Sequence, residues 1–171
     1  MIITLILALL LVAADQISKY FVLADLKPIG DVPVIDGVLH LHYTENTGAA
    51  FGIFPDSRWF FITVSLVASV AIIVYLLRKK TPVHTFGLVT LGMILGGALG
   101  NVIDRFRFGY VVDFIYVKAI NFAIFNVADS CITVGAILLC IYVIFFHDKY
   151  VEKLKGGAEA GEQVGGEETD S

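Results

Sequence analysis

Four long apolar runs dominate the pattern of hydrophobic and polar positions along the chain. They cover about residues 2–24, 59–77, 84–103 and 122–146. Each run approaches the roughly 20 residues that a helix needs to cross the hydrocarbon core of a bilayer. The pattern therefore predicts an α-helical integral membrane protein with four transmembrane helices, contained in a membrane domain of residues 1–148.

The two longer connections between the runs have strand character. Residues 32–43, VPVIDGVLHLHY, alternate around an Asp36-Gly37 pair that suits a tight turn, so a small hairpin is expected. Residues 110–117, YVVDFIYV, are rich in β-branched and aromatic residues and place Asp113 in an extended segment. With four crossings, both connections emerge on the same side of the membrane. We therefore expect a small extended platform there, with which an extended peptide could pair.

Composition agrees with a membrane protein. The 171 residues are 57% hydrophobic and only 16% charged, which excludes an ordinary soluble domain. The C-terminal end differs, because residues 156–171, GGAEAGEQVGGEETDS, contain five acids, no base and no aromatic residue. Such a composition predicts a disordered cytoplasmic tail over residues 149–171. Cys131 and Cys140 lie nine residues apart in one apolar run, too far along a helix to pair, and are expected to be packing residues.

The basic residues indicate the orientation, although their number alone does not. Six Lys or Arg residues lie near the ends of the predicted spans on each side of the membrane. Residues 78–80, RKK, form a short cluster without acids, whereas several of the opposing bases stand beside acids, so both termini are expected in the cytoplasm. Cleavage of the first run as a signal peptide is disfavoured, since no base precedes it and the apolar sequence resumes after Asp15.

Polar residues collect toward the opposite, extracytoplasmic face. An ionisable side chain costs about 2.5–3.5 kcal/mol at the centre of a bilayer, so it generally faces a partner or a cavity. Asn126 and Asp129 are three residues apart and would share one helical face at the start of the fourth span. The polar residues near this face are Asp15, Ser18, Lys19, Asn46, Gly48, Asn101, Asp104, Arg105, Asp113, Asn126 and Asp129. Their convergence suggests a site.

Several of these residues also have a structural interpretation. Asp15 and Lys19 have the i, i+4 spacing of an ion pair that stabilises a helix end. Asp104 and Arg105 follow the third apolar run, where charges at a bilayer surface are common. For both pairs the structural interpretation is favoured over a chemical one.

Glycines and histidines add two further expectations. Gly92, Gly96 and Gly100 repeat every four residues, which favours close packing of another helix. Gly96, Gly97 and Gly100 would also lower the helix profile, so that lipid acyl chains could lie against it. The alternating His40 and His42 lack a clear third ligand, so a metal site is not expected.

Asp113 and Asp129 come from different elements on the same membrane face. If they meet, repulsion and a low dielectric would let the pair hold a single proton near neutrality. Such a pair can activate water and polarise a carbonyl, but a proton-coupled carrier would use the same residues. A carrier needs polar groups toward the cytoplasmic ends, which are apolar here, and a purely structural role gives no reason to bear the cost of Asp129. Serine chemistry is less favoured, because no His stands beside a suitable Ser.

Five motifs resemble those of the bacterial lipoprotein signal peptidases, also called type II signal peptidases, in order and spacing. The resemblance runs from about residue 2 to residue 146. The motifs are DQISK (15–19), ENTGAAFG (45–52), GGALGNVIDR (96–105), VVDF (111–114) and FNVADS (125–130).

The resemblance implies an aspartic endopeptidase of the bacterial cytoplasmic membrane. It implies four transmembrane helices, a small extracytoplasmic β-cradle and a short amphipathic segment. Asp113 and Asp129 would be the catalytic pair. The positions implied to support the site or touch ligands are Asp15, Lys19, Asn46, Gly48, Gly97, Asn101, Arg105, Asn126 and Ala128. Arg105 could compensate a carboxylate, and Asn126 could orient Asp129.

The implied partners are all connected with the membrane. The substrates would be diacylglyceryl-modified prolipoproteins, cut just before the lipidated cysteine, and membrane lipids and a globomycin-type inhibitor are also expected to bind. No cofactor, metal or nucleic acid is expected.

Overall fold

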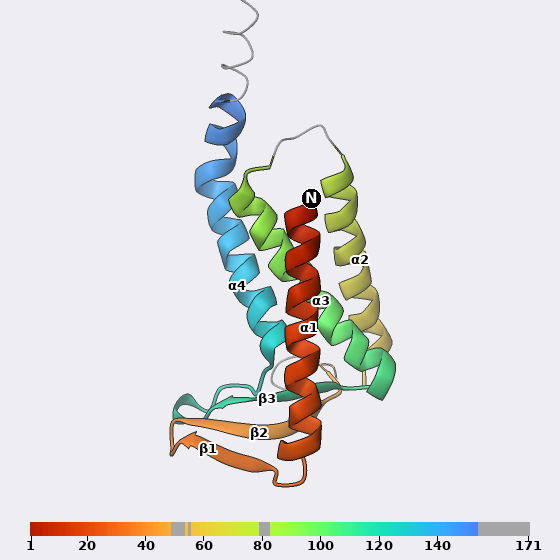
Figure 1. Cartoon of the computed structure of the whole chain (residues 1–171), viewed down its shortest axis with the longest axis vertical. Coiled ribbons are helices and arrows are strands. Elements are labelled where there is room, and N and C mark those ends of the chain that lie inside the picture. Colours follow the sequence, from red (N-terminus) through yellow and green to blue (C-terminus); the bar gives the residue numbers. More distant parts are fainter. Residues whose placement is uncertain (49–53, 55, 79–82, 154–171) are drawn as a thin grey trace, which may run out of the picture.

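The computed structural model describes residues 1–48, 54, 56–78 and 83–153. It contains four helices long and apolar enough to cross a membrane, which confirms the four predicted spans (Figure 1). The helices are α1 (Ile2–Phe21), α2 (Arg58–Leu77), α3 (Thr85–Phe108) and α4 (Val127–Tyr142). Short π-helical turns continue α1 over Val22–Leu26 and α4 over Val143–His147.

Helix α3 is the central helix, because it packs on α1, α2 and α4. Glycines permit the close approach. A Cβ on Gly96 would lie 2.9 Å from the carbonyl oxygen of Ala8 in α1, and one on Gly97 would overlap the carbonyl oxygen of Ala128 in α4. Gly100 faces the carboxylate of Asp15. The predicted packing role of the glycines is confirmed, and the predicted contact with acyl chains is wrong, since protein atoms cover these positions.

Two predicted helix boundaries are wrong. Helix α3 runs to Phe108, where Gly109 ends it in the left-handed conformation with φ +88°, so Asp104 and Arg105 lie inside the helix. Their side chains are 0% and 8% exposed, so the prediction that they are surface anchors is also wrong. Both errors arise because the prediction placed the end of the helix at the end of the apolar run. Helix α4 begins only at Val127, five residues later than predicted.

A three-stranded antiparallel sheet covers one end of the helices (Figure 1). Its strands, in the order β1-β2-β3, are β1 (Asp31–Ile35), β2 (Leu39–Asn46) and β3 (Val111–Val117). The predicted hairpin is confirmed, with Gly37 at φ +69° in its turn. Val22 and Leu26 at the end of the first helical segment form a core with Val112 and Phe114 of β3, which fixes the sheet to the helices.

The first and the last described residues lie away from the sheet. The N-terminus and the last residues of α4 are at the opposite end of the helices (Figure 1). Residues 149–153, predicted to belong to the tail, continue the helical segment, and the rest of the predicted tail lies outside the described residues. Lys79 and Lys80 of the predicted cytoplasmic loop also lie outside them, as do residues 49–53 and 55. Cys131 is buried, Cys140 is exposed, and both are free.

Candidate active site

The structure brings the predicted polar residues together where the sheet meets the helices. They come from five elements: α1, the end of β2, α3, β3 and the start of α4. Asp15, Lys19, Asn101, Arg105, Asp113 and Asn126 are buried, with exposed fractions between 0% and 8%. Gly97 and Ala128 form the close contact between α3 and α4 beneath them.

Asn126 organises the start of α4. It lies before the first helical residue in an extended conformation, with φ −130° and ψ −176°, so the prediction that it shares a helical face with Asp129 is wrong. Instead the two residues form a reciprocal capping box. The backbone N–H of Asp129 donates to Oδ1 of Asn126 at 2.9 Å, and the backbone N–H of Asn126 donates to Oδ2 of Asp129 at 3.2 Å. These two hydrogen bonds fix the carboxylate of Asp129 relative to Asn126.

Three asparagines hold the two carboxylates in one site. Asn126 Nδ2 donates to Oδ1 of Asp113 at 2.7 Å, and Asn46 Nδ2 donates to Oδ2 of Asp113 at 2.8 Å. Asn101 Nδ2 donates to Oδ1 of Asp129 at 2.7 Å. Each of the four carboxylate oxygens thus accepts one hydrogen bond from an asparagine, and Asn126 contacts both carboxylates. This arrangement answers the question that the sequence left open, namely whether the two aspartates meet.

The environment of Asp113 favours its protonated form. Burial raises the pKa of Asp113 to about 7, and the nearby charge of Asp129 contributes to the rise. The hydrogen bonds from Asn46 and Asn126 act in the opposite direction. Two carboxylates so placed can hold one proton between them near neutral pH.

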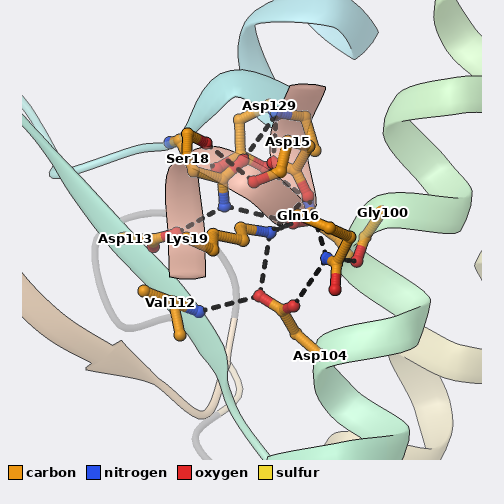
Figure 2. Close-up of polar contacts among 12 residues, drawn as sticks. Asp15, Gln16, Ser18, Lys19, Gly100, Asp104, Val112, Asp113 and Asp129 are labelled. Atoms are coloured by element: carbon orange, nitrogen blue, oxygen red, sulfur yellow. Dashed lines mark hydrogen bonds and ion pairs between the residues drawn. The ribbon is translucent and has the colours of Figure 1, made fainter. Parts of the chain in front are cut away.

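A buried lysine lies beside the carboxylate pair without touching it. Lys19 Nζ is 2.9 Å from Oδ2 of Asp15 and 2.8 Å from Oδ2 of Asp104, and it donates to Oδ1 of Asn101 at 3.1 Å. Figure 2 shows its side chain directed between these groups. The ion pair with Asp15 was predicted and is confirmed. One ammonium group is thus shared by two carboxylates. Gln16 provides a further hydrogen bond, in which its Nε2 donates to Oδ1 of Asp104 at 2.9 Å.

Gln16 was not identified from the sequence as a site residue, and Asp104 was named among the converging residues but interpreted as a surface anchor. Oδ2 of Asp104 also accepts the backbone N–H of Val112 at 3.1 Å, one residue before Asp113 (Figure 2). Asp104 therefore fixes β3 where it carries the carboxylate. Its spacing of three from Asn101 was a usable signal, since one more helical turn after residue 103 puts both side chains on one face.

Arg105 supports the site through the backbone. Its Nη2 donates to the carbonyl oxygen of Gly48 at 3.0 Å, and the N–H of Gly48 donates to Oδ1 of Asn46 at 3.0 Å. Its guanidinium lies 5.0 Å from the ring centre of Phe61. Within the described part of the chain Arg105 forms no ion pair, and the compensation of a carboxylate by Arg105 stays a prediction.

The remaining candidates are a cavity and a histidine pair. A cavity of about 550 Å³ adjoins Asp129, with Asn46, Asn101 and Arg105 also in its lining. Nδ1 of His40 and Nδ1 of His42 lie 2.8 Å and 3.0 Å from the two carboxylate oxygens of Asp31 on the sheet. Among the described residues no group of three or more potential ligands is arranged to hold a metal ion.

Comparisons with known proteins agree on one family. The family described as Signal peptidase (SPase) II matches residues 7–145. The chain is 45% identical to a lipoprotein signal peptidase of Clostridioides difficile, over 85% of this chain and 97% of that protein. It is 50% identical to one of Caldanaerobacter subterraneus, over 77% and 88% of the two chains. A solved structure described as a bacterial membrane enzyme superposes with a TM-score of 0.74 at 36% identity, over 82% of this chain and 87% of that one.

Replacing Lys19 tests the buried charge network. We expect Lys19→Met to destabilise the protein by about 3–5 kcal/mol, because it leaves buried carboxylates without a cation. Lys27→Met is the matched control: Lys27 also pairs with a carboxylate, Glu45 at 3.0 Å, but both side chains are more than 40% exposed. The thermal unfolding midpoints of both variants in one detergent measure the difference. Equal shifts would contradict the assigned importance of Lys19.

Proposed function

The chain belongs to the signal peptidase II family, and we propose that it removes signal peptides from lipoprotein precursors with Asp113 and Asp129 as its catalytic pair. It is a multi-pass bacterial membrane protein and an aspartic peptidase by family. The observation that carries the residue assignment is the contact of Asn126 with both carboxylates. The comparisons give no support to a proton-coupled carrier.

The geometry supports general acid–base hydrolysis without a metal. Asp113, whose pKa is raised to about 7, keeps a proton that it can donate to the oxygen of the scissile carbonyl. Asp129, ionised, accepts a proton from a water molecule as the water oxygen attacks the carbonyl carbon. The resulting tetrahedral intermediate breaks its C–N bond when the leaving amine takes the proton from Asp129, and one hydroxyl of the intermediate returns its proton to Asp113. The products are a carboxylic acid and an amine, and the pair again holds one proton.

The location of the site explains a membrane-bound substrate. The carboxylates lie where the helices end against the sheet, and a precursor is tethered to the bilayer by its own signal helix. We infer that the diacylglyceryl group on the cysteine sets the scissile bond at the depth of Asp113 and Asp129. Moving an acyl chain from lipid to a protein surface gains little free energy. The main contribution of the diacylglyceryl group is therefore to position the scissile bond.

Amide substitutions test the catalytic pair. Asp113→Asn and Asp129→Asn should each lower cleavage of a diacylglyceryl-modified precursor by at least about 1,000-fold, because an amide performs neither proton transfer. The assay measures release of the signal peptide by the purified chain. Circular dichroism and the thermal midpoint check that each variant is folded. Near-normal turnover by either folded variant would refute its catalytic role.

The same assay tests the role of the lipid and the expected inhibitor. A precursor with an unmodified cysteine should be cut far more slowly than the lipidated one, and globomycin should compete with the lipidated precursor. Equal rates for the two precursors in one detergent would remove the positioning argument and leave the peptidase assignment intact.

The pH dependence of cleavage tests the protonation of Asp113. Because its pKa is raised to about 7, kcat/KM should fall as pH rises above 7 and the pair loses its proton. Asn46→Ala removes a hydrogen bond that stabilises the ionised form, so the alkaline limb should move to higher pH in this variant. An alkaline limb at the same pH in both proteins would exclude Asp113 as the titrating group.

We further propose that both chain ends face the cytoplasm and the sheet faces outward. Support comes from the basic cluster at residues 78–80 and from the N-terminus and residues 148–153, which lie at the end of the helices opposite the sheet (Figure 1). In a cysteine-free background, Asp36→Cys at the hairpin turn should react with a membrane-impermeant thiol reagent in intact cells, and Arg78→Cys should not. Both positions are exposed, so the reverse pattern would reverse the orientation.

A further inference from the structure

A groove leads from the carboxylate pair into the membrane-spanning part of the protein. The cavity beside Asp129 continues along α4 to Thr133 and Val134, and Phe61 and Ser65 of α2 form its other wall. Helix α2 packs on α3 and has no substantial contact with α4, so the groove lies between α2 and α4. Thr133 and Val134 are exposed, which leaves the groove open to the side at the depth of the spans.

Two hydroxyl groups line this groove without a partner. In the part of the chain that the structure describes, neither the hydroxyl of Ser65 nor that of Thr133 makes a hydrogen bond. Some other hydroxyls in the spans are bonded to backbone carbonyls, as is usual in helices. Ser69 Oγ donates to the carbonyl of Ser65 at 2.8 Å, and Thr90 Oγ1 donates to that of Gly87 at 2.9 Å.

A signal helix needs such partners when it is cut. Its backbone must unwind around the scissile bond, which frees N–H and C=O groups in a region with little water. Each unsatisfied group there costs several kcal/mol. The N–H groups of β3 on the two sides of Asp113 are not available to the freed carbonyl groups, because that of Val112 donates to Asp104 and that of Phe114 donates to the carbonyl of Phe125.

We propose that the groove binds the unwound last turn of the signal peptide, and that Ser65 and Thr133 are hydrogen-bond partners of its freed backbone. The inference rests on the proposed function and names the part of the substrate that the groove takes. Thr133 is one helical turn from Asp129, about 6 Å along α4, which an extended chain spans in about two residues. The hydroxyls therefore meet the residues just before the scissile bond. The hydrocarbon part of an acyl chain has no polar group to pair with them.

Conservative substitutions separate hydrogen bonding from packing. We expect Thr133→Val, which keeps the shape and removes the hydroxyl, to lower kcat/KM for the lipidated precursor by about 3- to 10-fold, and Ser65→Ala to do the same. Thr133→Ser keeps the hydroxyl and should remain within about twofold of the unchanged protein. Thr63→Val is the matched control, because Thr63 is exposed on α2 and does not line the groove.

The outcomes distinguish the inference from the function on which it rests. Normal cleavage by Thr133→Val, or a loss in Thr133→Ser as large as in Thr133→Val, would overturn the hydroxyl role and leave the peptidase assignment standing. If the unchanged protein does not cut the precursor, the proposed function fails and the inference with it.

A second comparison tests the occupant of the groove. The loss in Thr133→Val should be the same for precursors carrying dioctanoylglyceryl and dipalmitoylglyceryl groups, because the hydroxyl contacts the peptide. A loss that changes with acyl-chain length would assign the groove to an acyl chain and refute the proposal.

Discussion

The ammonium group of Lys19 is the interaction on which the site depends. It lies within 3 Å of Asp15 and of Asp104, and each of these carboxylates holds a second element. Asp15 Oδ1 accepts the N–H of Ala128 at the start of α4, and Asp104 accepts the N–H of Val112 in β3. One buried cation therefore positions both elements that carry the two carboxylates, Asp113 and Asp129. Its desolvation is compensated by contacts that a single ion pair would not provide.

The protein separates the charges that hold the fold from the groups that hold the two carboxylates. Lys19 reaches Asp129 only through Asn101, which accepts from the ammonium and donates to the carboxylate. An ammonium in direct contact would stabilise the ionised form of that carboxylate. Neutral amides fix the carboxylate oxygens without adding a full positive charge. The asparagines at positions 46, 101 and 126 therefore suit the proposed acid–base chemistry as well as the geometry.

The sequence predicted the elements better than their ends. The four spans and the hairpin followed from hydrophobic length and an Asp-Gly turn, which are local signals. The end of α3 did not, because hydropathy reports contact with lipid and not the last helical hydrogen bond. Asp104 looked like a surface charge, since its partner Lys19 is 85 positions away and no local pattern announces that contact. The contact of Asn126 with Asp113 likewise depends on how β3 and α4 come together.

An intramembrane peptidase needs a fixed site geometry and a path for its substrate. Different sides of helix α3 meet these two requirements. Toward α1 and α4 its glycines bring backbones into contact, and the buried charges add directional bonds. This packing allows little displacement of the carboxylates. Between α2 and α4 the helix borders the open groove. A substrate confined to the bilayer must arrive from the side, so access requires a gap between spans. The fixed side supplies the accurate geometry, and the gap on the other side supplies access without disturbing it.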